Sequence, residues 1–315
     1  MFRDWMPVGL FLLGVVAVAH LTDVDWVRYA EYPAHYQMIY GQRGDVDLAV
    51  IGSSRSMRVF QADSVSAAVE KSLGVKPVIC DLSRAWRDLG HMEVFIRDLL
   101  AARKVRMLLV EFKETGVQNR HPYFERTATW QDIFASYHAQ PSVPWFMRVH
   151  EQVVLSLQRV TNRLTMWLTG SLKPIATPAA PARLVDPSKP YLVKSELLTE
   201  TRRKHASKWT DEAPASVDLA AVDEERNLHY LQQIIGLARQ SGTEVVFYYI
   251  PRLYHMPLAT EFVASFEARF GVRLVQPTLA ELKSVMPDGY TDSTHMGVGG
   301  SLLYADLLAR ALPWK

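Results

Sequence analysis

Short apolar runs that alternate with helical segments constrain the fold of this 315-residue chain more than any other feature. Residues 46–51, 76–82 and 105–112 are brief apolar runs, and helix-like apolar spacing lies between them at 60–73 and 88–103. A strand inside a parallel sheet reads as a continuous apolar run, because helices cover both of its faces. The pattern therefore predicts an α/β domain in which a parallel sheet lies between helices.

The same alternation resumes in the last third of the chain. We expect helices and strands in turn at residues 225–240, 243–250, 257–270, 272–275 and about 299–312. The second and fourth of these ranges are the strands. Together with the first three runs they predict a parallel sheet of about five strands.

A long stretch separates the third predicted strand from the fourth. A structureless loop of this length is improbable in a compact domain, so we expect a helical insert at about residues 115–224. Within it, residues 144–172 have helical apolar spacing and mostly basic charges. This helix either faces the core or lies on a membrane or a membrane partner. The proline-rich residues 173–189 are typical of a linker or surface loop.

The amino terminus is apolar and uncharged over residues 5–21. A bilayer-spanning helix needs roughly 20 apolar residues, with a lower limit near 17, so this segment is just long enough. We expect a retained transmembrane anchor at residues 1–22 and a domain at 23–315 outside the cytoplasm. The alternatives are a cleaved signal peptide, since residues 17–19 fit a small-x-small cleavage site, and a buried soluble helix.

Charge balance and cysteine content exclude several classes of function and of binding site for this chain. The chain has 35 basic and 33 acidic residues, and this balance argues against a nucleic-acid-binding protein, which normally carries a basic excess. Its single cysteine, Cys80, excludes an intrachain disulfide and a multi-thiolate metal site. The sequence contains neither clustered metal-ligand spacing nor a Walker-type phosphate loop, so we expect no metal and no cofactor.

A serine-rich turn, Gly52-Ser53-Ser54-Arg55-Ser56, directly follows the first predicted strand. The carboxyl end of a parallel strand is where open α/β sheets bind their ligands. Glycine permits a sharp turn that exposes the next side chains, and the first N–H groups of a following helix can stabilise an oxyanion. The turn is therefore a candidate for a catalytic serine, with ordinary helix capping as the alternative.

A second candidate motif, Asp292-Ser293-Thr294-His295, precedes the last predicted helix. An aspartate and a histidine three residues apart can meet across one turn, where the carboxylate orients the imidazole and the other ring nitrogen acts as a general base. A capping aspartate beside a surface histidine is the alternative. Combined with the serine turn, the motif supplies nucleophile, orienting acid and base in the order Ser…Asp…His.

In this combination the chain resembles the SGNH (GDSL-type) superfamily of esterases and acyltransferases. The resemblance covers residues 46–113 and 243–312 and leaves the insert unexplained. It implies a flavodoxin-like sheet, with Ser54 as nucleophile, His295 as base and Asp292 as the orienting acid. The layout is similar to the membrane-anchored O-acyltransferase branch, whose members act in D-alanylation of teichoic acid and O-acetylation of polysaccharides.

The sequence departs from the family at two further motifs. After the second strand the family has a glycine whose N–H binds the oxyanion, and here residues 81–85 read DLSRA. After the third strand the family has G-x-N-D, and here residues 111–116 read EFKETG. The backbone N–H of Ser54 is then the first candidate for the oxyanion hole, followed by the N–H of Arg84 and the ammonium group of Lys113.

Two more residues are candidates for substrate contact. Arg55 follows the candidate nucleophile and suits an anionic substrate, with a structural or solvent-facing role as the alternative. His255 follows the fourth predicted strand at the same edge of the sheet.

The resemblance implies acyl transfer through a serine ester. We expect a single-pass protein of the cell membrane that transfers acyl groups, with acetyl the expected group, to a polysaccharide on the periplasmic side. A multi-spanning membrane-bound O-acyltransferase is the expected partner. An esterase or deacetylase, which would use the same residues with water as the acceptor, is the first alternative. A non-catalytic binding or assembly subunit is the second, and the altered second and third motifs favour it.

Overall fold

The computed structural model of the chain describes residues 23–41, 44–60, 66–68, 70–71, 74, 76–83, 88–113, 124–171, 225–253, 257–285, 289–290 and 294–312. The chain divides into two compact units. The first takes its residues from 1–42 and 119–182, and the second from 43–118 and 183–315. The expected anchor at residues 1–22 lies outside the described residues, and none of the helices within them is long and apolar enough to cross a membrane.

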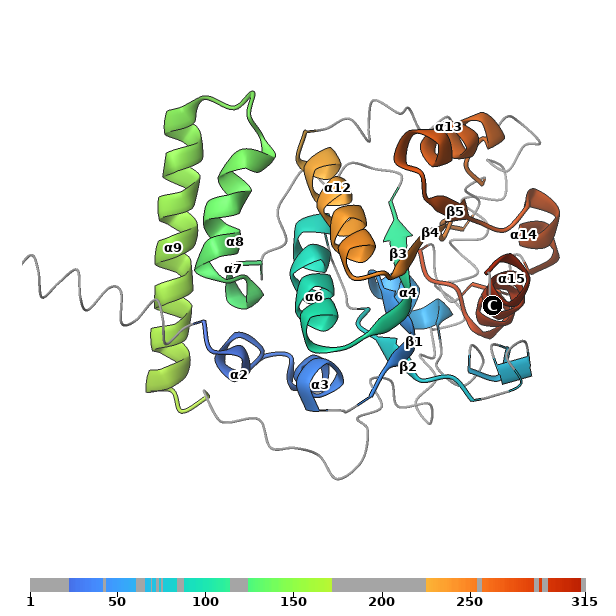
Figure 1. Ribbon diagram of the computed structural model, residues 1–315, viewed down its shortest axis with the longest axis horizontal. Coiled ribbons are helices and arrows are strands. Elements are labelled where there is room, and N and C mark those ends of the chain that lie inside the picture. The colour runs from blue at the N-terminus through green and yellow to red at the C-terminus, as the bar shows by residue number, and fades with distance from the viewer. Residues whose placement is uncertain are drawn as a thin grey trace, which may run out of the picture. The chain divides into compact units, whose positions relative to one another are not determined.

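The second unit is built on a five-stranded sheet (Figure 1). Its strands are β1 (Val46–Ile51), β2 (Ile79–Asp81), β3 (Val105–Phe112), β4 (Glu244–Tyr249) and β5 (Arg273–Val275). All neighbouring pairs are parallel, and their order across the sheet is β2-β1-β3-β4-β5. The predicted α/β class and the five-stranded parallel sheet are therefore confirmed.

Helices cover both faces of this sheet. One face packs against α4 (Ser54–Val59), α14 (Leu279–Val285) and α15 (Val298–Ala311). The opposite face packs against α6 (Leu89–Ala102), α12 (Glu225–Gln240) and α13 (Thr260–Phe270). The inner strands are apolar on both sides for this reason, since each side chain along them meets one helical layer or the other.

The strand order places a reversal of direction at β1. The chain crosses from β1 to β2 on one side and then returns past β1 to β3 on the other. In open parallel sheets this reversal leaves a crevice at the carboxyl ends of the two strands, where ligands bind. The turn after β1 and the end of β3 are therefore the parts of this unit best placed to form a site.

The first unit is helical. Its elements are α2 (Asp25–Arg28), α3 (Pro33–Tyr36), the π-helical η1 (Gln37–Gly41), α7 (Phe124–Thr127), α8 (Trp130–Ala135), the 3-10 helix η2 (Ser136–Ala139) and α9 (Trp145–Leu168). The last four lie between β3 and β4 in the chain, within the range expected for the insert. The helix predicted over residues 144–172 is α9, which is the longest described helix.

A short helix, α4, precedes the range in which the sequence pattern predicts a helix. A single helix was expected over residues 60–73, but α4 begins at Ser54, directly after β1, and ends before Phe60. The ring of Phe60 packs edge-on against Tyr248 in the core, with centroids 4.7 Å apart. Residues 66–68 and 70–71 are helical and fall inside the predicted range.

Candidate active site

The hydroxyl of Ser54 meets the imidazole of His295. Ser54 Oγ lies 2.8 Å from His295 Nε2, although the two residues are 241 positions apart in the chain. Ser54 is the first residue of α4, and His295 lies three residues before the start of α15. Both side chains are half-buried, so each keeps part of its surface exposed.

The second ring nitrogen of His295 also has a partner. Thr294 Oγ1 lies 3.0 Å from His295 Nδ1. When Nε2 accepts the serine proton, Nδ1 carries the ring proton and Thr294 Oγ1 is an acceptor for it. The two contacts are compatible with the tautomer that carries its proton on Nδ1, which a general base acting on Ser54 requires.

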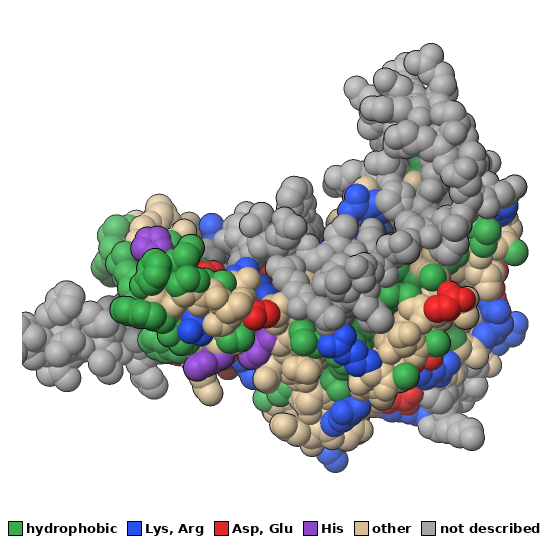
Figure 2. Space-filling model, turned by 90° about the horizontal axis from the view of Figure 1, so that it is seen from above, with side chains coloured by type: hydrophobic (Ala, Val, Ile, Leu, Met, Phe, Trp, Pro, Cys, Tyr) green, Lys and Arg blue, Asp and Glu red, His purple; other side chains and the backbone are tan. Residues whose placement is uncertain are grey.

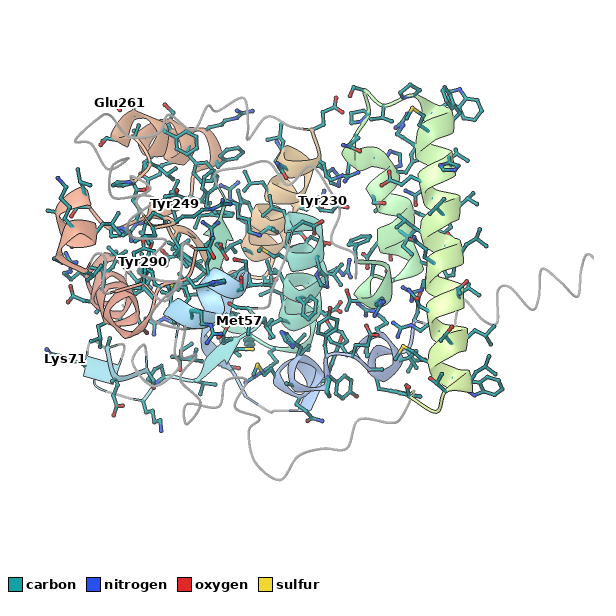
Figure 3. The ribbon with its side chains drawn as sticks, turned by 180° about the vertical axis from the view of Figure 1, so that it is seen from behind. Met57, Lys71, Tyr230, Tyr249, Glu261 and Tyr290 are labelled. Carbon is teal, nitrogen blue, oxygen red and sulfur yellow. The ribbon has the colours of Figure 1, made fainter. Side chains whose placement is uncertain are left out.

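The backbone around Ser54 is held by the start of α4. Ser53 is the N-cap residue of the helix, and its side chain accepts a hydrogen bond from the Arg55 N–H. The first N–H groups of a helix have no acceptor within the helix itself. The Ser54 N–H is one of these groups, which suits the oxyanion role that the sequence predicts for it. Figure 3 shows α4 from behind, with Met57 labelled.

A buried carboxylate beneath this turn organises the residues on either side of Ser54. Glu111, on β3, is fully buried. Its oxygens accept hydrogen bonds from the Ser53 N–H, from Ser53 Oγ at 2.9 Å and from Ser56 Oγ at 2.5 Å. The guanidinium of Arg55 lies 3.0 Å away from it. One side chain thus fixes Ser53, Arg55 and Ser56 around the candidate nucleophile.

Glu111 remains ionised in this setting. Burial alone would raise its pKa, but the positive charges of Arg55 and Lys113 and the hydrogen bonds from Ser56 and Ser53 hold the pKa below its ordinary value. A buried charge is stable only when it is paired and its hydrogen bonds are satisfied. The turn therefore depends on a complete set of partners for one carboxylate.

Two further residues pack closely against this network. The Tyr248 hydroxyl lies 2.8 Å from Ser56 Oγ and 3.2 Å from the Ile51 carbonyl oxygen, which links β4 to the turn. A Cβ atom on Gly52 would lie 2.0 Å from Ser56 Oγ and 2.6 Å from a Glu111 oxygen. Glycine is required at position 52 because the side chains beneath the turn occupy the space of any larger residue.

Arg55, the candidate for substrate contact, and Lys113, the candidate for the oxyanion hole, both interact with Glu111. Arg55 is buried, and besides Glu111 it binds the Ile250 carbonyl oxygen at 2.7 Å, at the end of β4. This geometry favours the structural role that the sequence left open for Arg55. Lys113 is half-buried, and its positive charge helps to lower the pKa of Glu111.

Three predicted site residues lie outside the described residues. They are the orienting acid Asp292, the oxyanion candidate Arg84 and the substrate candidate His255. Their roles stay predictions from the sequence. Among the residues that the structure describes, no group of His, Cys, Asp and Glu side chains is placed to hold a metal ion.

Sequence reasoning missed Glu111, Ser56 and Tyr248 as parts of the site. Glu111 interrupts the otherwise apolar end of its predicted strand, and a charged residue at such a position was the available signal. Ser56 and Tyr248 gave no comparable signal, because serine is ordinary in turns and tyrosine in strands.

The arrangement has the parts of a serine-based acyl-transfer site: a hydroxyl, a histidine in contact with it and a helix N-terminus. In comparisons with known proteins, the sequence matches no family model and no curated protein. The residues of this chain are therefore the only basis for proposing its function.

Proposed function

We propose that this protein is a membrane-anchored, extracytoplasmic serine O-acyltransferase that modifies a polysaccharide through an acyl-serine intermediate. The observation that carries the proposal is the 2.8 Å contact between Ser54 Oγ and His295 Nε2. A serine hydroxyl is a weak nucleophile unless a base lies within hydrogen-bond reach, and this contact meets that requirement.

The reaction has two steps. In the first, Ser54 Oγ attacks the carbonyl carbon of the donor ester while His295 Nε2 takes the serine proton, and the departing alcohol then takes that proton from His295. In the second, a hydroxyl of the acceptor gives its proton to His295 and attacks the acyl-serine. Ser54 regains its proton as the acyl group leaves. The Ser54 N–H is suited to stabilise the oxyanion in both steps.

The fold is consistent with the resemblance that suggested this chemistry. The strand order 2-1-3-4-5 is that of flavodoxin-like sheets, and their ligands bind beside the first and third strands. Ser54 lies three residues after the end of the first strand, and the supporting carboxylate of Glu111 lies on the third. The sequence pattern adds Asp292 as the acid expected to orient His295.

Active-site labelling tests the nucleophile. The full chain, in native membranes, should form one covalent adduct with an activated fluorophosphonate, detected by mass spectrometry on the peptide that contains Ser54. Ser54→Ala and His295→Ala should abolish the adduct, whereas Ser284→Ala, on an exposed position of α14, should leave it unchanged. Folded wild-type protein that forms no adduct would overturn the enzymatic proposal in favour of a binding subunit.

The fate of the acyl group separates a transferase from an esterase. An acyl-serine formed from a 4-nitrophenyl acetate donor should decay faster when an oligosaccharide acceptor is added, with the acetyl group recovered on the sugar. Release of acetate at a rate that no acceptor changes would instead assign the protein as a hydrolase.

A further inference from the structure

Helix α9 turns its polar side inward, the reverse of an ordinary surface helix. Its buried side chains are Gln152, Leu155, Arg159 and Arg163. Its other charged residues, Arg148 and Glu151, are half-buried. Along residues 145–168, none of the exposed side chains therefore belongs to a lysine, arginine, aspartate or glutamate. A helix that faces water normally shows its charges on the outer side.

An apolar stripe occupies the outer side of α9. Its main members, here called the outer stripe, are Trp145, Val149, Val153, Leu157, Leu164 and Trp167. Leu157 is 61% exposed, and the tryptophans near the two ends are each 67% exposed. From Trp145 to Trp167 the stripe is about 33 Å long at 1.5 Å per residue. Figure 2 shows hydrophobic side chains gathered over this part of the first unit.

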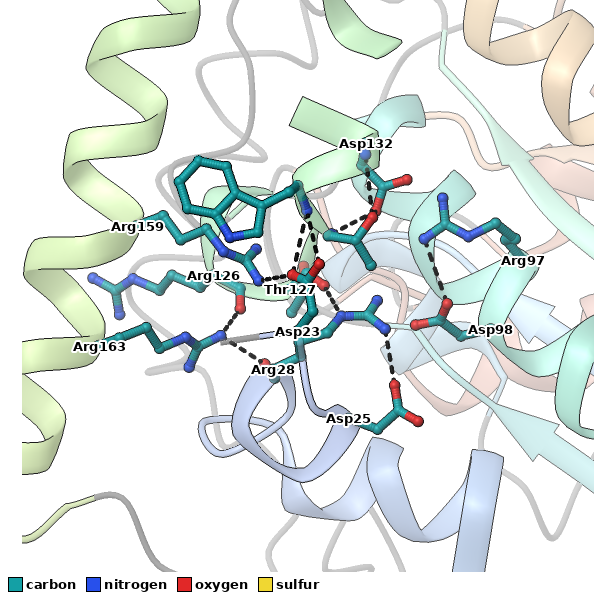
Figure 4. Close-up of polar contacts among 12 residues, drawn as sticks. Asp23, Asp25, Arg28, Arg97, Asp98, Arg126, Thr127, Asp132, Arg159 and Arg163 are labelled. Carbon is teal, nitrogen blue, oxygen red and sulfur yellow. Dashed lines mark hydrogen bonds and ion pairs between the residues drawn. The ribbon is translucent and has the colours of Figure 1, made fainter. Parts of the chain in front are cut away.

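An ion pair links this helix to the start of the described chain, two residues after the uncharged amino-terminal segment. Asp23, the first described residue, pairs with the fully buried guanidinium of Arg159 at 2.5 Å (Figure 4). The apolar segment ends at Leu21, which is within roughly 7 Å of Asp23 along the chain. With the lengths of the two side chains added, a bilayer that holds residues 5–21 begins within roughly 20 Å of the middle of α9.

Arginine side chains of the first unit hold α9 against the residues that follow the amino-terminal segment. Arg163 donates to the carbonyl oxygens of Arg28 and Arg126, and Arg28 donates to the Thr127 carbonyl oxygen at 2.7 Å (Figure 4). These contacts tie α9 to both α2 and α7. The orientation of the outer stripe is thus fixed relative to α2 and to Asp23, the first described residue after the apolar segment.

We propose that α9 lies in the plane of the membrane, with its outer stripe buried among the lipid headgroups and upper acyl chains. A bilayer is the occupant that the chain continuity favours, since it is already adjacent if residues 5–21 are an anchor. The two tryptophans suit the headgroup level, where aromatic rings are enriched. The inference rests on the membrane attachment in the proposed function, but not on its serine chemistry.

Spin-label accessibility in the reconstituted full chain tests this contact. The protein is placed in vesicles of phosphatidylethanolamine and phosphatidylglycerol with a nitroxide on Leu157→Cys. Leu302→Cys, on α15, is the matched control because Leu302 is also leucine and is 57% exposed. The native Cys80 is buried, and burial raises its thiol pKa to about 12, so it stays unlabelled.

A lipid contact predicts collision rates that differ by probe. Molecular oxygen concentrates in lipid, whereas a nickel chelate stays in water. The ratio of nitroxide collisions with oxygen to collisions with the chelate should therefore be several-fold higher at position 157 than at position 302. Gln158→Cys, next in sequence but off the outer stripe, should show a lower ratio than position 157. A ratio at 157 equal to that at both controls would place the stripe in water and overturn the inference.

Protein contacts give a different result. Low collision rates for both probes, with an immobilised nitroxide, would mean that another segment or another protein covers the stripe, and would overturn the lipid assignment. Dipolar broadening between labelled copies would identify that protein as a second copy of this chain. Fluorophosphonate labelling of Ser54 in the same vesicles is read separately. Failure of the serine chemistry therefore leaves the accessibility result intact, and the reverse also holds.

Discussion

Glu111 carries a negative charge in a place that water does not reach, and three residues around Ser54 are fixed by it. Ser53 and Ser56 donate hydrogen bonds to its oxygens, and Arg55 supplies the opposite charge. Because these residues lie on either side of Ser54, Glu111 holds the backbone around the candidate nucleophile in place from beneath the turn. Its loss should therefore change both stability and the reactivity of Ser54.

Replacing Glu111 with Gln tests this positioning role. Gln keeps the shape but leaves the Arg55 charge buried without its partner, which should lower the free energy of unfolding by about 3 kcal/mol. The rate of fluorophosphonate labelling at Ser54 should fall as well, measured at a temperature where the variant is still folded. Glu261→Gln, on the exposed first turn of α13, is the control and should change neither quantity. Labelling at the wild-type rate in Glu111→Gln would contradict the positioning role.

The lowered pKa of Glu111 also predicts how stability depends on pH. An acid whose pKa is lower in the folded protein adds stability above its ordinary pKa of 4.5, and this stability is lost as the pH falls through the folded value. The difference in unfolding temperature between wild type and Glu111→Gln should therefore be largest near neutral pH and shrink below pH 4.5. If this difference in unfolding temperature instead increased as the pH fell, Glu111 would not be ionised in the folded protein.

At the scale of elements, α9 depends on buried charge where most helices depend on apolar packing. Arg159 is fully buried, pairs with Asp23 and lies over the ring of Trp130 at 5.5 Å. Removing one partner of a buried ion pair leaves the other charge without compensation. The link between α9 and the residues before α2 should therefore be sensitive to a single substitution.

Arg159→Ala should destabilise the first unit by more than the roughly 1 kcal/mol of an exposed pair, because the Arg159 side chain is fully buried although Asp23 keeps 31% of its side chain exposed. Arg310→Ala is the matched control: Arg310 pairs with Glu281 at 2.6 Å but is largely exposed, and exposed pairs contribute less than about 1 kcal/mol. Limited proteolysis should cut Arg159→Ala within residues 124–171 much faster than wild type. Equal cleavage of the two variants would mean that the half-buried pair of Arg159 and Asp23 adds no more stability than the exposed pair.

Elements with a strong apolar pattern could be predicted from the sequence to the residue. The first and third strands and the helix over 225–240 have the predicted bounds, because each is an uninterrupted apolar run or a regular amphipathic pattern. The short helices α7 and α8 could not be predicted, since four to six residues carry too little periodicity. The contact between Ser54 and His295 was predicted from motifs. Glu111 was missed because its partners are distant in sequence and meet only in the folded sheet.

At the scale of the whole second unit, one face of the sheet supports every described part of the site. Side chains alternate along β3, so Leu109 and Glu111 point to one face and Leu108 to the other. The core on the first face includes Leu109 together with Phe60, which follows α4, and Met296, which follows His295. The geometry between Ser54 and His295 is therefore set by packing on this face.

Two neighbouring leucines separate packing on this face from stability in general. Leu109→Ala and Leu108→Ala each remove a buried side chain, and each should cost about 3 kcal/mol in the free energy of unfolding. Only Leu109→Ala leaves its cavity in the core shared by α4 and the residues around His295. At a temperature where both variants are folded, Leu109→Ala should label more slowly at Ser54, whereas Leu108→Ala should label at the wild-type rate. Equal rates in the two variants would mean that the contact between Ser54 and His295 is held by its local hydrogen bonds, independently of the core beneath it.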